Sequence, residues 1–460
     1  MGKRYNIAMF TDSFYPKMGG IEVHIFSLAQ CLLKLKHKVI VITRQLEKCY
    51  GVRYMEGGLK VYYIPTLTVF PDFFSSFPLI RYILIQEKIN IIHAHSEMYH
   101  IGMEAVAYGN LMKIHTIITL HSLFGLSTEK TILFNYFFSA IHRSYCHYIC
   151  VSNSTKINFL MRYQKVEIND EPGKYTNISV IPNAICTNLF KPLKCVFDKT
   201  DYSTKMSKPL IYKKMITIVI VTRLEYRKGI MLIPGILKRL FHKYSNVNVI
   251  IGGSGSKRIY LEEFREKFDL HDKINILGGI RNEFVRDVLV KGDIFLNTSL
   301  TESFCIAILE AAACGLYVVS TNVGGIPEVA QNLNKDMIKL TEPSVCSLTE
   351  SLFEAIDFIR TTPTNILSKL KKEQYLSIKS IYNWNWVAEE TCKIYQKISL
   401  RKHRDKRYIL RGVYQHVHHP INLLFIVYSF VMWLWFIVLQ FLFPMDKIES
   451  CDIDDSNYEI

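Results

Sequence analysis

Residues 5–43 read YNIAMFTDSFYPKMGGIEVHIFSLAQCLLKLKHKVIVIT. The stretch opens with a short apolar run at 5–11, which predicts a strand, and then passes through a Gly-Gly turn. The periodic segment at 21–36 predicts a helix, and 37–43 predicts the next strand. This order is a βαβ unit, and such units build parallel sheets with helices on both faces.

The same alternation continues along the chain and restarts once. In the first half, further strands are expected at 61–64, 89–93, 116–120, 148–151 and 178–181. After the irregular segment 186–214, they are expected at 216–221, 247–251, 274–277, 294–297 and 316–320. We therefore predict an α/β protein with two Rossmann-like lobes that face a cleft. The expected domains are 1–195 and 215–400, joined by a linker or insertion at 196–214.

The composition limits the classes of function. The chain has 460 residues, of which 49% are apolar and 21% charged, so it can bury a large core. A formal net charge of +15 favours phosphate-bearing ligands or an anionic membrane surface. The basic residues are spread along the chain without zinc-finger spacing, so we expect no nucleic-acid partner. The eleven cysteines form no CxxC pair, which favours free thiols in a reducing compartment.

One segment near the C-terminus predicts a membrane span. Residues 421–443 carry no charge, and about 20 apolar residues suffice to cross a bilayer. The flank at 401–420 is dense in Arg and Lys, whereas the tail at 444–460 is acidic. Positive flanks stay cytoplasmic, and the N-terminus shows no signal peptide. We expect cytosolic domains, one transmembrane helix and a lumenal tail; a buried core helix is the alternative for this segment.

Two cations follow the predicted strand 216–221. Arg223 and Lys228, in the string TRLEYRKG, stand where the carboxyl end of a parallel strand meets a ligand. A guanidinium fork and an ammonium point charge together suit a diphosphate. A solvated turn is the alternative interpretation, but the position after a strand favours function.

Two glutamates, Glu302 and Glu310, stand in the string LTESFCIAILEAAACG at 300–315. Carboxylates are almost never fully buried unless they are paired. A helix is expected to begin near Ser303, which places Glu302 at its start and Glu310 two turns further along. Each carboxylate can accept hydrogen bonds from sugar or ribose hydroxyls. The alternative for Glu310 is an Arg or Lys partner from a neighbouring element.

Two further candidate features, a glycine pair and a histidine, come after predicted strands of the first half. The Gly19-Gly20 turn lets the backbone approach a phosphate, although glycines also serve tight turns for geometry alone. His121 follows the strand 116–120 and is expected to face the cleft. A lone histidine is as often structural as functional at such a place.

Together these motifs resemble the retaining nucleotide-sugar glycosyltransferases of family four, which have the GT-B fold. The shared features are GGIEVH at 19–24, Arg223 with Lys228-Gly229, GGSG at 252–255 and the Glu302-x7-Glu310 pair. The strings HSLFG at 121–125, LNTSLTE at 296–302 and VGGIPE at 323–328 resemble the phosphatidylinositol N-acetylglucosaminyltransferase branch of that family. The resemblance runs from about residue 5 to residue 400.

The resemblance implies transfer of GlcNAc from UDP-GlcNAc to phosphatidylinositol with retention of configuration. This reaction is the first step of GPI-anchor synthesis, on the cytosolic face of the endoplasmic reticulum. It implies a multi-subunit membrane complex and no metal or other cofactor. Front-face attack and a covalent intermediate both remain open. A related enzyme with another donor or acceptor is the first alternative, and a non-catalytic scaffold is the second.

The resemblance also assigns roles, with 1–195 as the acceptor-side domain and 215–400 as the UDP-sugar-binding domain. Arg223 and Lys228 hold the donor diphosphate and stabilise the departing UDP. Glu302 orients the donor sugar, Glu310 holds the ribose, and His121 lies beside the reacting sugar. The rest of the donor site comes from Gly19, Gly20, Ser303, Phe304 and Cys305, and the acceptor site from Asp12, Gly19, Gly20 and His121. The chain departs from many relatives at 182–186, where it reads PNAIC and has Cys186 in place of an acid.

Overall fold

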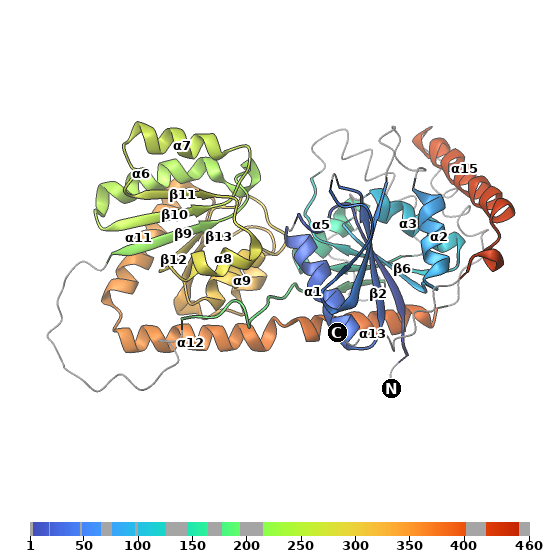
Figure 1. Cartoon of the computed structure of the whole chain (residues 1–460). Helices are drawn as coiled ribbons and strands as arrows, with labels where there is room; N and C mark the ends of the chain where they lie inside the picture. The colour runs from blue at the N-terminus through green and yellow to red at the C-terminus, as the bar shows by residue number, and fades with distance from the viewer. Residues whose placement is uncertain are drawn as a thin grey trace. The chain divides into compact units, whose positions relative to one another are not determined.

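The computed structural model (Figure 1) describes residues 3–17, 19–46, 48–65, 76–96, 100–125, 146–163, 177–193, 215–401 and 420–449. The expected linker at 196–214 lies outside these ranges, as do most of the basic segment 401–420 and the end of the tail. By its contacts the chain divides into two compact units. Unit 1 comprises 1–151, 155–181 and 385–460, and unit 2 comprises 152–154 and 182–384.

Unit 1 is built around an eight-stranded sheet in the order β3-β4-β2-β1-β5-β6-β7-β8. The strands are β1 Asn6–Thr11, β2 Lys38–Arg44, β3 Gly51–Met55, β4 Leu59–Ile64, β5 Ile91–His95, β6 His115–Leu120, β7 Cys146–Cys150 and β8 Ile178–Val180. The helices are α1 Gly20–Lys34, α2 Phe77–Gln86, α3 His100–Leu111, α5 Asn153–Tyr163, α13 Trp384–Ser399 and α15 Pro420–Leu442. All pairings are parallel except that of β3 with β4.

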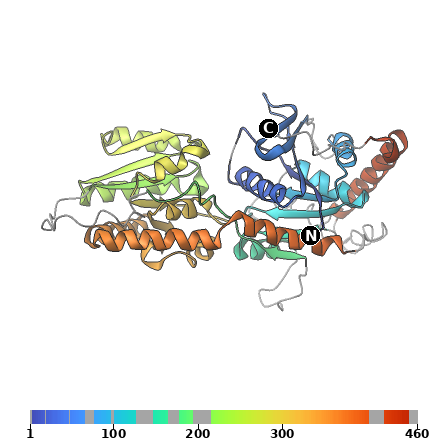
Figure 2. The same cartoon turned by 60° about the horizontal axis from the view of Figure 1, so that its bottom comes forward.

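Helices cover both faces of this sheet, because its buried strands are apolar on both sides. Ala8 and Phe10 of β1 pack into the cluster that contains α2 and α3. The alternate residues of β1, Ile7 and Met9, are equally buried, as is Leu28 of α1. Figures 1 and 2 show α1 and α3 on opposite sides of the strands. The doubly wound α/β arrangement expected from residues 5–43 is therefore confirmed for this unit.

Unit 2 contains a six-stranded, all-parallel sheet in the order β11-β10-β9-β12-β13-β14. The strands are β9 Ile216–Val221, β10 Val247–Gly252, β11 Ile274–Gly278, β12 Ile294–Asn297, β13 Tyr317–Thr321 and β14 Ile338–Thr341. The helices are α6 Ile233–Lys243, α7 Arg258–Lys267, α8 Asn282–Leu289, α9 Ile306–Ala313, α10 Ile326–Ala330, α11 Val345–Thr361 and α12 Thr364–Ile381.

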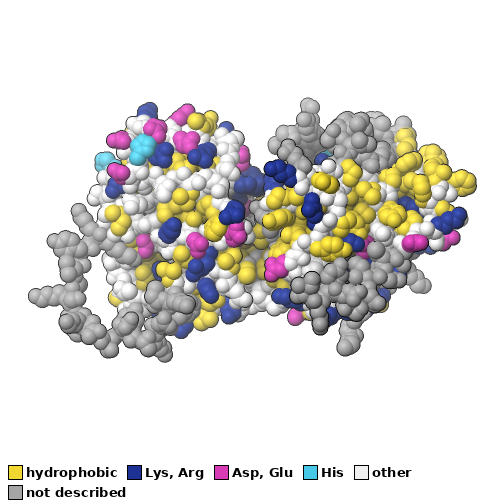
Figure 3. Space-filling model, in the orientation of Figure 1, with side chains coloured by type: hydrophobic (Ala, Val, Ile, Leu, Met, Phe, Trp, Pro, Cys, Tyr) yellow, Lys and Arg dark blue, Asp and Glu magenta, His cyan; other side chains and the backbone are white. Residues whose placement is uncertain are grey.

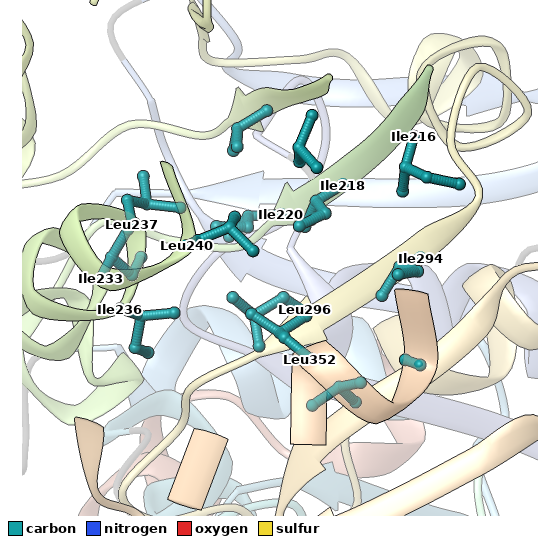
Figure 4. Close-up of a cluster of buried hydrophobic side chains, with 14 of the residues drawn as sticks. Ile216, Ile218, Ile220, Ile233, Ile236, Leu237, Leu240, Ile294, Leu296 and Leu352 are labelled. Carbon is teal, nitrogen blue, oxygen red and sulfur yellow. The ribbon is translucent and has the colours of Figure 1, made fainter. Parts of the chain in front are cut away.

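The core of unit 2 explains why the apolar run at 216–221 is a strand. Its isoleucines at 216, 218 and 220 are fully buried on one side of β9, as the period of two predicts. Figure 4 shows them against Ile233, Ile236, Leu237 and Leu240 of α6, Ile294 and Leu296 of β12, and Leu352 of α11. Burying one such side chain contributes about 1.5–3 kcal/mol. This cluster fixes β9, and with it the turn that follows.

Two strands were missed by the sequence pattern. The edge strand β3 presents only exposed or half-buried residues, so no apolar run marks it. The edge strand β14 has four half-buried residues and is equally inconspicuous. The helix α13 also differs from the expected domain limits, because Tyr395 hydrogen-bonds His93 in unit 1 (Oη to Nδ1, 2.8 Å). The described cysteines are all free.

The helix α15 covers the segment that we expected to cross a membrane. Among the residues that the structure describes, no helix is both long and apolar enough for a membrane span, so this expectation is not confirmed. The helix packs on unit 1 through Met432 and Leu439, which contact Phe77 and Tyr108. Arg81 of α2 donates a hydrogen bond to Gln440 (Nη2 to Oε1, 2.7 Å).

Candidate active site

The candidate site of unit 2 lies at the topological switch point of its sheet. After β9 the chain winds outward through β10 and β11, and it then returns to place β12 on the other side of β9. Loops after β9 and β12 therefore diverge at one edge of the sheet, which is where open α/β sheets bind ligands. Both motifs that the sequence singled out, 222–229 and 297–302, are these loops.

The turn after β9 holds three cations. Arg223 and Arg227 are exposed, and the Lys228 side chain is 16% exposed. Leu224 between them is fully buried and anchors the turn through its N–H, which donates to the carbonyl of Ser254 at 2.8 Å. Sequence reasoning missed Arg227, although it stands in the same string as the other two cations. Three cations in six residues provide the charge that a diphosphate requires.

Gly229 allows this turn to approach the loop after β12. Its φ of +66° is in the left-handed region, and a Cβ would lie 1.8 Å from the carbonyl oxygen of Thr298. Only glycine accommodates both conditions. Thr298 in turn donates through Oγ1 to the carbonyl of Lys228 at 2.8 Å, and Leu300 N–H donates to the carbonyl of Arg227 at 2.9 Å. The two motifs are thus joined through their backbones.

Lys228 and Glu302 form an ion pair across this junction. Ser299 donates through Oγ to Glu302 Oε1 at 3.0 Å and lies 2.9 Å from Asn297 Oδ1. Asn297 donates to Ser320 Oγ of β13 at 2.9 Å. Asn297 and Ser299 were not assigned roles from the sequence, yet they hold the Glu302 carboxylate in place. Glu302 is thus oriented by its neighbours before any ligand binds.

The helix after Glu302 begins later than expected. The sequence predicts a start near Ser303, but α9 begins at Ile306, because Cys305 has a left-handed φ of +66°. Residues 303–305 form a loop in which Phe304 is buried and its ring lies 6.0 Å from that of Tyr382. Gly325 passes so close that a Cβ would lie 2.0 Å from the Ser303 carbonyl oxygen. The VGGIPE string therefore has a steric function here.

Glu310 lies one turn into α9 without a cationic partner. No described residue donates a hydrogen bond to its carboxylate, and burial raises its pKa to about 7. The alternative that Glu310 is held by an Arg or Lys is therefore not met among the described residues. Leaving such a group unpaired costs free energy that a ligand's hydroxyl groups could recover. Of the two glutamates, only Glu302 has a partner among these residues.

In unit 1, Asp12 and the glycine pair serve helix starts. Asp12 follows β1 and accepts hydrogen bonds from the backbone N–H groups of His100 and Ile101, both at 3.1 Å, so it caps α3. Burial raises its pKa, against the opposing effect of Arg44. Gly19 precedes α1 and donates its N–H to Glu22 Oε2 at 2.9 Å, while Gly20 is the exposed first residue of the helix. Neither glycine has a positive φ.

His121 follows β6 and belongs to a cluster of buried histidines. Its Nε2 lies 3.2 Å from His95 Nδ1 at the end of β5, and its ring lies 4.6 Å from that of His24 in α1. Burial, followed by the neighbouring His24, holds the pKa of His121 well below its usual range. The sequence identified only His121. The signal for His95 was the HAH alternation at 93–95, which places His93 and His95 on one side of β5.

The comparisons with known proteins agree with this architecture. Residues 44–128 match the family model described as PIGA (GPI anchor biosynthesis), and 201–355 match Glycosyl transferases group 1. A glycosyltransferase structure from Rickettsia africae has a TM-score of 0.67 at 18% identity, covering 87% of this chain and all of that chain.

Two curated relatives are similar over most of the chain, and both are named as subunits of phosphatidylinositol N-acetylglucosaminyltransferase. The Homo sapiens relative is 41% identical, over 98% of this chain and 88% of the relative. The Arabidopsis thaliana relative is 39% identical, over 86% of this chain and 82% of the relative. The chain has the GT-B glycosyltransferase fold and belongs to the PIGA family of phosphatidylinositol N-acetylglucosaminyltransferase subunits.

Proposed function

We propose that this chain is the glycosyltransferase subunit that moves GlcNAc from UDP-GlcNAc to phosphatidylinositol, the first step of GPI-anchor biosynthesis. Membership of the family is the observation that supports this reaction. The junction of the 222–229 and 297–302 loops supplies charged and polar groups suited to it. In the transfer, the bond between the sugar C1 and the β-phosphate oxygen breaks, and UDP leaves with the electron pair. A bond from C1 to an inositol oxygen forms, and the inositol hydroxyl loses its proton.

In the proposed donor site, Arg223 and Lys228 stabilise the negative charge that develops on the departing UDP. Preorganised charges of this kind are often the largest contribution to catalysis. Lys228 is already positioned by Glu302, so it loses little entropy when the diphosphate binds. Glu302 keeps an oxygen for the sugar hydroxyls, and the unpaired Glu310 is available to the ribose diol. These roles need no metal at the diphosphate.

His121 is proposed to lie beside the reacting sugar, in a neutral state. Its lowered pKa means that at neutral pH the imidazole carries no charge, so it can accept or donate one hydrogen bond to a sugar hydroxyl. We also propose that the chain retains the anomeric configuration and works within a complex with other subunits. The names of the relatives as subunits support the latter.

A transfer assay tests this function. The purified complex would be supplied with labelled UDP-GlcNAc and phosphatidylinositol vesicles, and the lipid product identified by chromatography. We expect GlcNAc-phosphatidylinositol from the natural chain and almost none from a complex with Lys228→Ala. Transfer from a different sugar nucleotide only, or to a different lipid only, would instead support a related enzyme of the same fold.

Cells distinguish an enzyme from a scaffold. Depletion of the chain should remove GPI-anchored proteins from the cell surface, and the natural chain should restore them. A Lys228→Ala chain that assembles with its partners should fail to restore them. Full restoration by this variant and by Glu310→Ala would favour a non-catalytic role.

We further propose that the C-terminal segment attaches the chain to the endoplasmic reticulum membrane, with both units cytosolic and the tail lumenal. The uncharged run at 421–443 and its basic flank support this proposal. Side chains of α15 that face away from unit 1 are apolar and exposed: Val427, Phe430, Trp433, Leu434, Ile437 and Phe441. Figure 3 shows hydrophobic side chains gathered over this helix.

Topology mapping tests the attachment. A glycosylation sequence added after residue 460 should be modified in microsomes if the tail is lumenal, whereas one placed in the linker at 196–214 should not. Modification of the linker site, or release of the chain by alkaline carbonate, would contradict the proposed arrangement.

A further inference from the structure

Unit 1 contains a group of three buried histidines, and the proposed transfer reaction gives a role to only one of them, His121. His24, His95 and His121 each offer a ring nitrogen, and these nitrogens all lie within 4.8 Å of one another. The side chains are 3%, 0% and 8% exposed, respectively. They come from three different elements: His24 from α1, His95 from the end of β5, and His121 from the residue after β6.

The cluster stands at the switch point of the unit 1 sheet. The chain winds from β1 outward through β2 and β4, then crosses back so that β5 lies on the other side of β1. The carboxyl ends of β1 and β5 diverge at this place, as those of β9 and β12 do in unit 2. The three imidazoles therefore occupy the position where such sheets bind ligands.

The spacing of His95 and His121 suits two ligands of one metal ion. Their facing nitrogens, Nδ1 and Nε2, are 3.2 Å apart. With Zn–N bonds of about 2.0–2.1 Å and tetrahedral angles, two ligand nitrogens lie about 3.3 Å apart. Two hydrogen-bonded imidazoles have the same separation, so this distance is compatible with a metal site but does not establish one. A second observation is needed.

His95 provides the second observation. Its Nε2 is buried and has no hydrogen-bond partner among the described residues. Buried polar groups in native proteins usually have a partner, and an orphaned one calls for an explanation such as an ion. Because one imidazole gives only one nitrogen to an ion, an ion at Nε2 would leave the 3.2 Å contact of Nδ1 with His121 as a hydrogen bond.

A fourth histidine orients the cluster without belonging to it. Both nitrogens of His93 are occupied, Nδ1 by Tyr395 Oη at 2.8 Å and Nε2 by Thr119 Oγ1 at 2.7 Å. Its ring stacks on that of His95, with centroids 4.4 Å apart. Such supporting groups fix the orientation of metal-binding imidazoles. Tyr395 belongs to α13, so this helix also supports the cluster.

We propose that His24, His95 and His121 form a binding site for one divalent transition-metal ion of the zinc class. Three neutral imidazoles are a ligand set preferred by zinc, copper and nickel over magnesium or calcium. A three-histidine site leaves a fourth position for water or a ligand oxygen. The charge of the donor diphosphate is met by the unit 2 cations, so the ion has no part in holding the diphosphate, and the proposal does not depend on the proposed transfer.

The experiment measures Co²⁺ and Zn²⁺ binding to the full chain in its purified complex. We expect one Co²⁺ per chain after dialysis, with the strong visible absorption of a low-symmetry site and imidazole nitrogens in its X-ray absorption spectrum. His24→Gln and His95→Gln should each weaken binding at least about tenfold. His147→Gln is the matched control, because His147 is also buried in a strand of this sheet but lies outside the cluster, with its Nε2 3.0 Å from Ser179 Oγ.

Two results would overturn the proposal. One is less than a tenth of an equivalent of metal on the natural chain, which would leave a hydrogen-bonded histidine cluster or a buried water. The other is unchanged binding in both variants that retain their circular dichroism. Should a variant fail to fold, the X-ray absorption spectrum of the natural chain decides, since a first shell without imidazoles contradicts the site.

Discussion

The two units each contain a lysine–glutamate ion pair, and the two pairs differ in burial and in what surrounds them. In unit 1, Glu87 lies at the end of α2 and is fully buried. Lys60 and Lys38 contact its two oxygens at 2.5 and 2.6 Å, and the Tyr62 hydroxyl donates to it as well. In unit 2, Lys228 and Glu302 are 16% and 11% exposed and stand beside two exposed arginines.

The difference follows from the two ends of a parallel sheet. Lys38 and Lys60 lie at the amino ends of β2 and β4, where the carboxylate is enclosed and paired with both ammonium groups. Lys228 and Glu302 lie in loops after the carboxyl ends of β9 and β12, where strands diverge and leave room for a ligand. The same chemical pair is therefore structural in one unit and, we propose, catalytic in the other. Variants of the two units can break or sharpen this contrast.

The largest effect is expected from Lys228→Ala in unit 2. Loss of one preorganised charge at a developing anion lowers turnover by roughly 10²–10³-fold. The fold should be retained, because the side chain is partly exposed. The measurement is the rate of GlcNAc transfer by the assembled complex, with the exposed Lys291→Ala as control. Activity within threefold of the natural chain would remove Lys228 from the donor site.

Lys60→Met in unit 1 should lower the stability of the fold, whereas Lys228→Ala lowers the rate of transfer. Breaking a buried ion pair from one side costs roughly 3–5 kcal/mol of stability. Although burial alone would raise it, hydrogen bonds from Lys38, Lys60 and Tyr62 hold the pKa of Glu87 below its ordinary value. The stabilisation by Glu87 is therefore present above the unfolded pKa and is lost as the pH falls through the lower, folded one.

Thermal unfolding of the natural complex and the Lys60→Met complex between pH 3 and pH 7 measures this effect. We expect the gap between the two midpoints to be widest near neutral pH and to narrow in acid. A gap that does not change with pH would mean that Lys60 acts by packing alone.

Comparing Gly229→Ala with Gly58→Ala should separate the free-energy cost of a steric clash from the cost of placing alanine in the left-handed region. Gly229 and Gly58 share a positive φ, +66° and +74°, but a Cβ at Gly58 meets no atom within 4 Å, whereas at Gly229 it meets a carbonyl oxygen. Alanine in the left-handed region costs about 1–2 kcal/mol at either position. The clash at Gly229 should add about 1–3 kcal/mol. Denaturant unfolding of the two variants gives the difference, and equal losses would argue against the close approach of the two loops.

Glu310→Gln should change stability the least of these variants, and its effect on stability should depend on pH. The pKa of Glu310 is raised by burial to about 7, so the folded chain binds an extra proton between about pH 4.5 and pH 7. Its stability therefore falls as the pH rises through this window, and Gln should remove that fall, which amounts to roughly 1–2 kcal/mol for a partly exposed group. The variant should be more stable than the natural chain at pH 8 but bind UDP-GlcNAc more weakly. Unchanged affinity for UDP-GlcNAc would show that Glu310 does not hold the ribose.

Much of this organisation could be predicted from the sequence. The strands β9 and β12 begin and end at the predicted residues, because buried parallel strands are uninterrupted apolar runs. The positions of Arg223 and Lys228 after β9 follow from the same pattern. These features are local: a strand, its end and the next turn lie within a dozen residues, where periodicity and turn residues suffice.

The tertiary structure decided which side chains meet. Lys228 pairs with Glu302, 74 residues further on, whereas Glu310 has no such partner among the described residues. This difference depends on the order of strands in the sheet, which no local sequence pattern encodes. Asp12, expected at the acceptor site, caps α3. The meeting of His24, His95 and His121 is set by the crossing from β4 to β5. The sequence determined most of the elements, although not the edge strands β3 and β14 or the start of α9. The sheet order brought distant residues together, because only packing fixes long-range contacts.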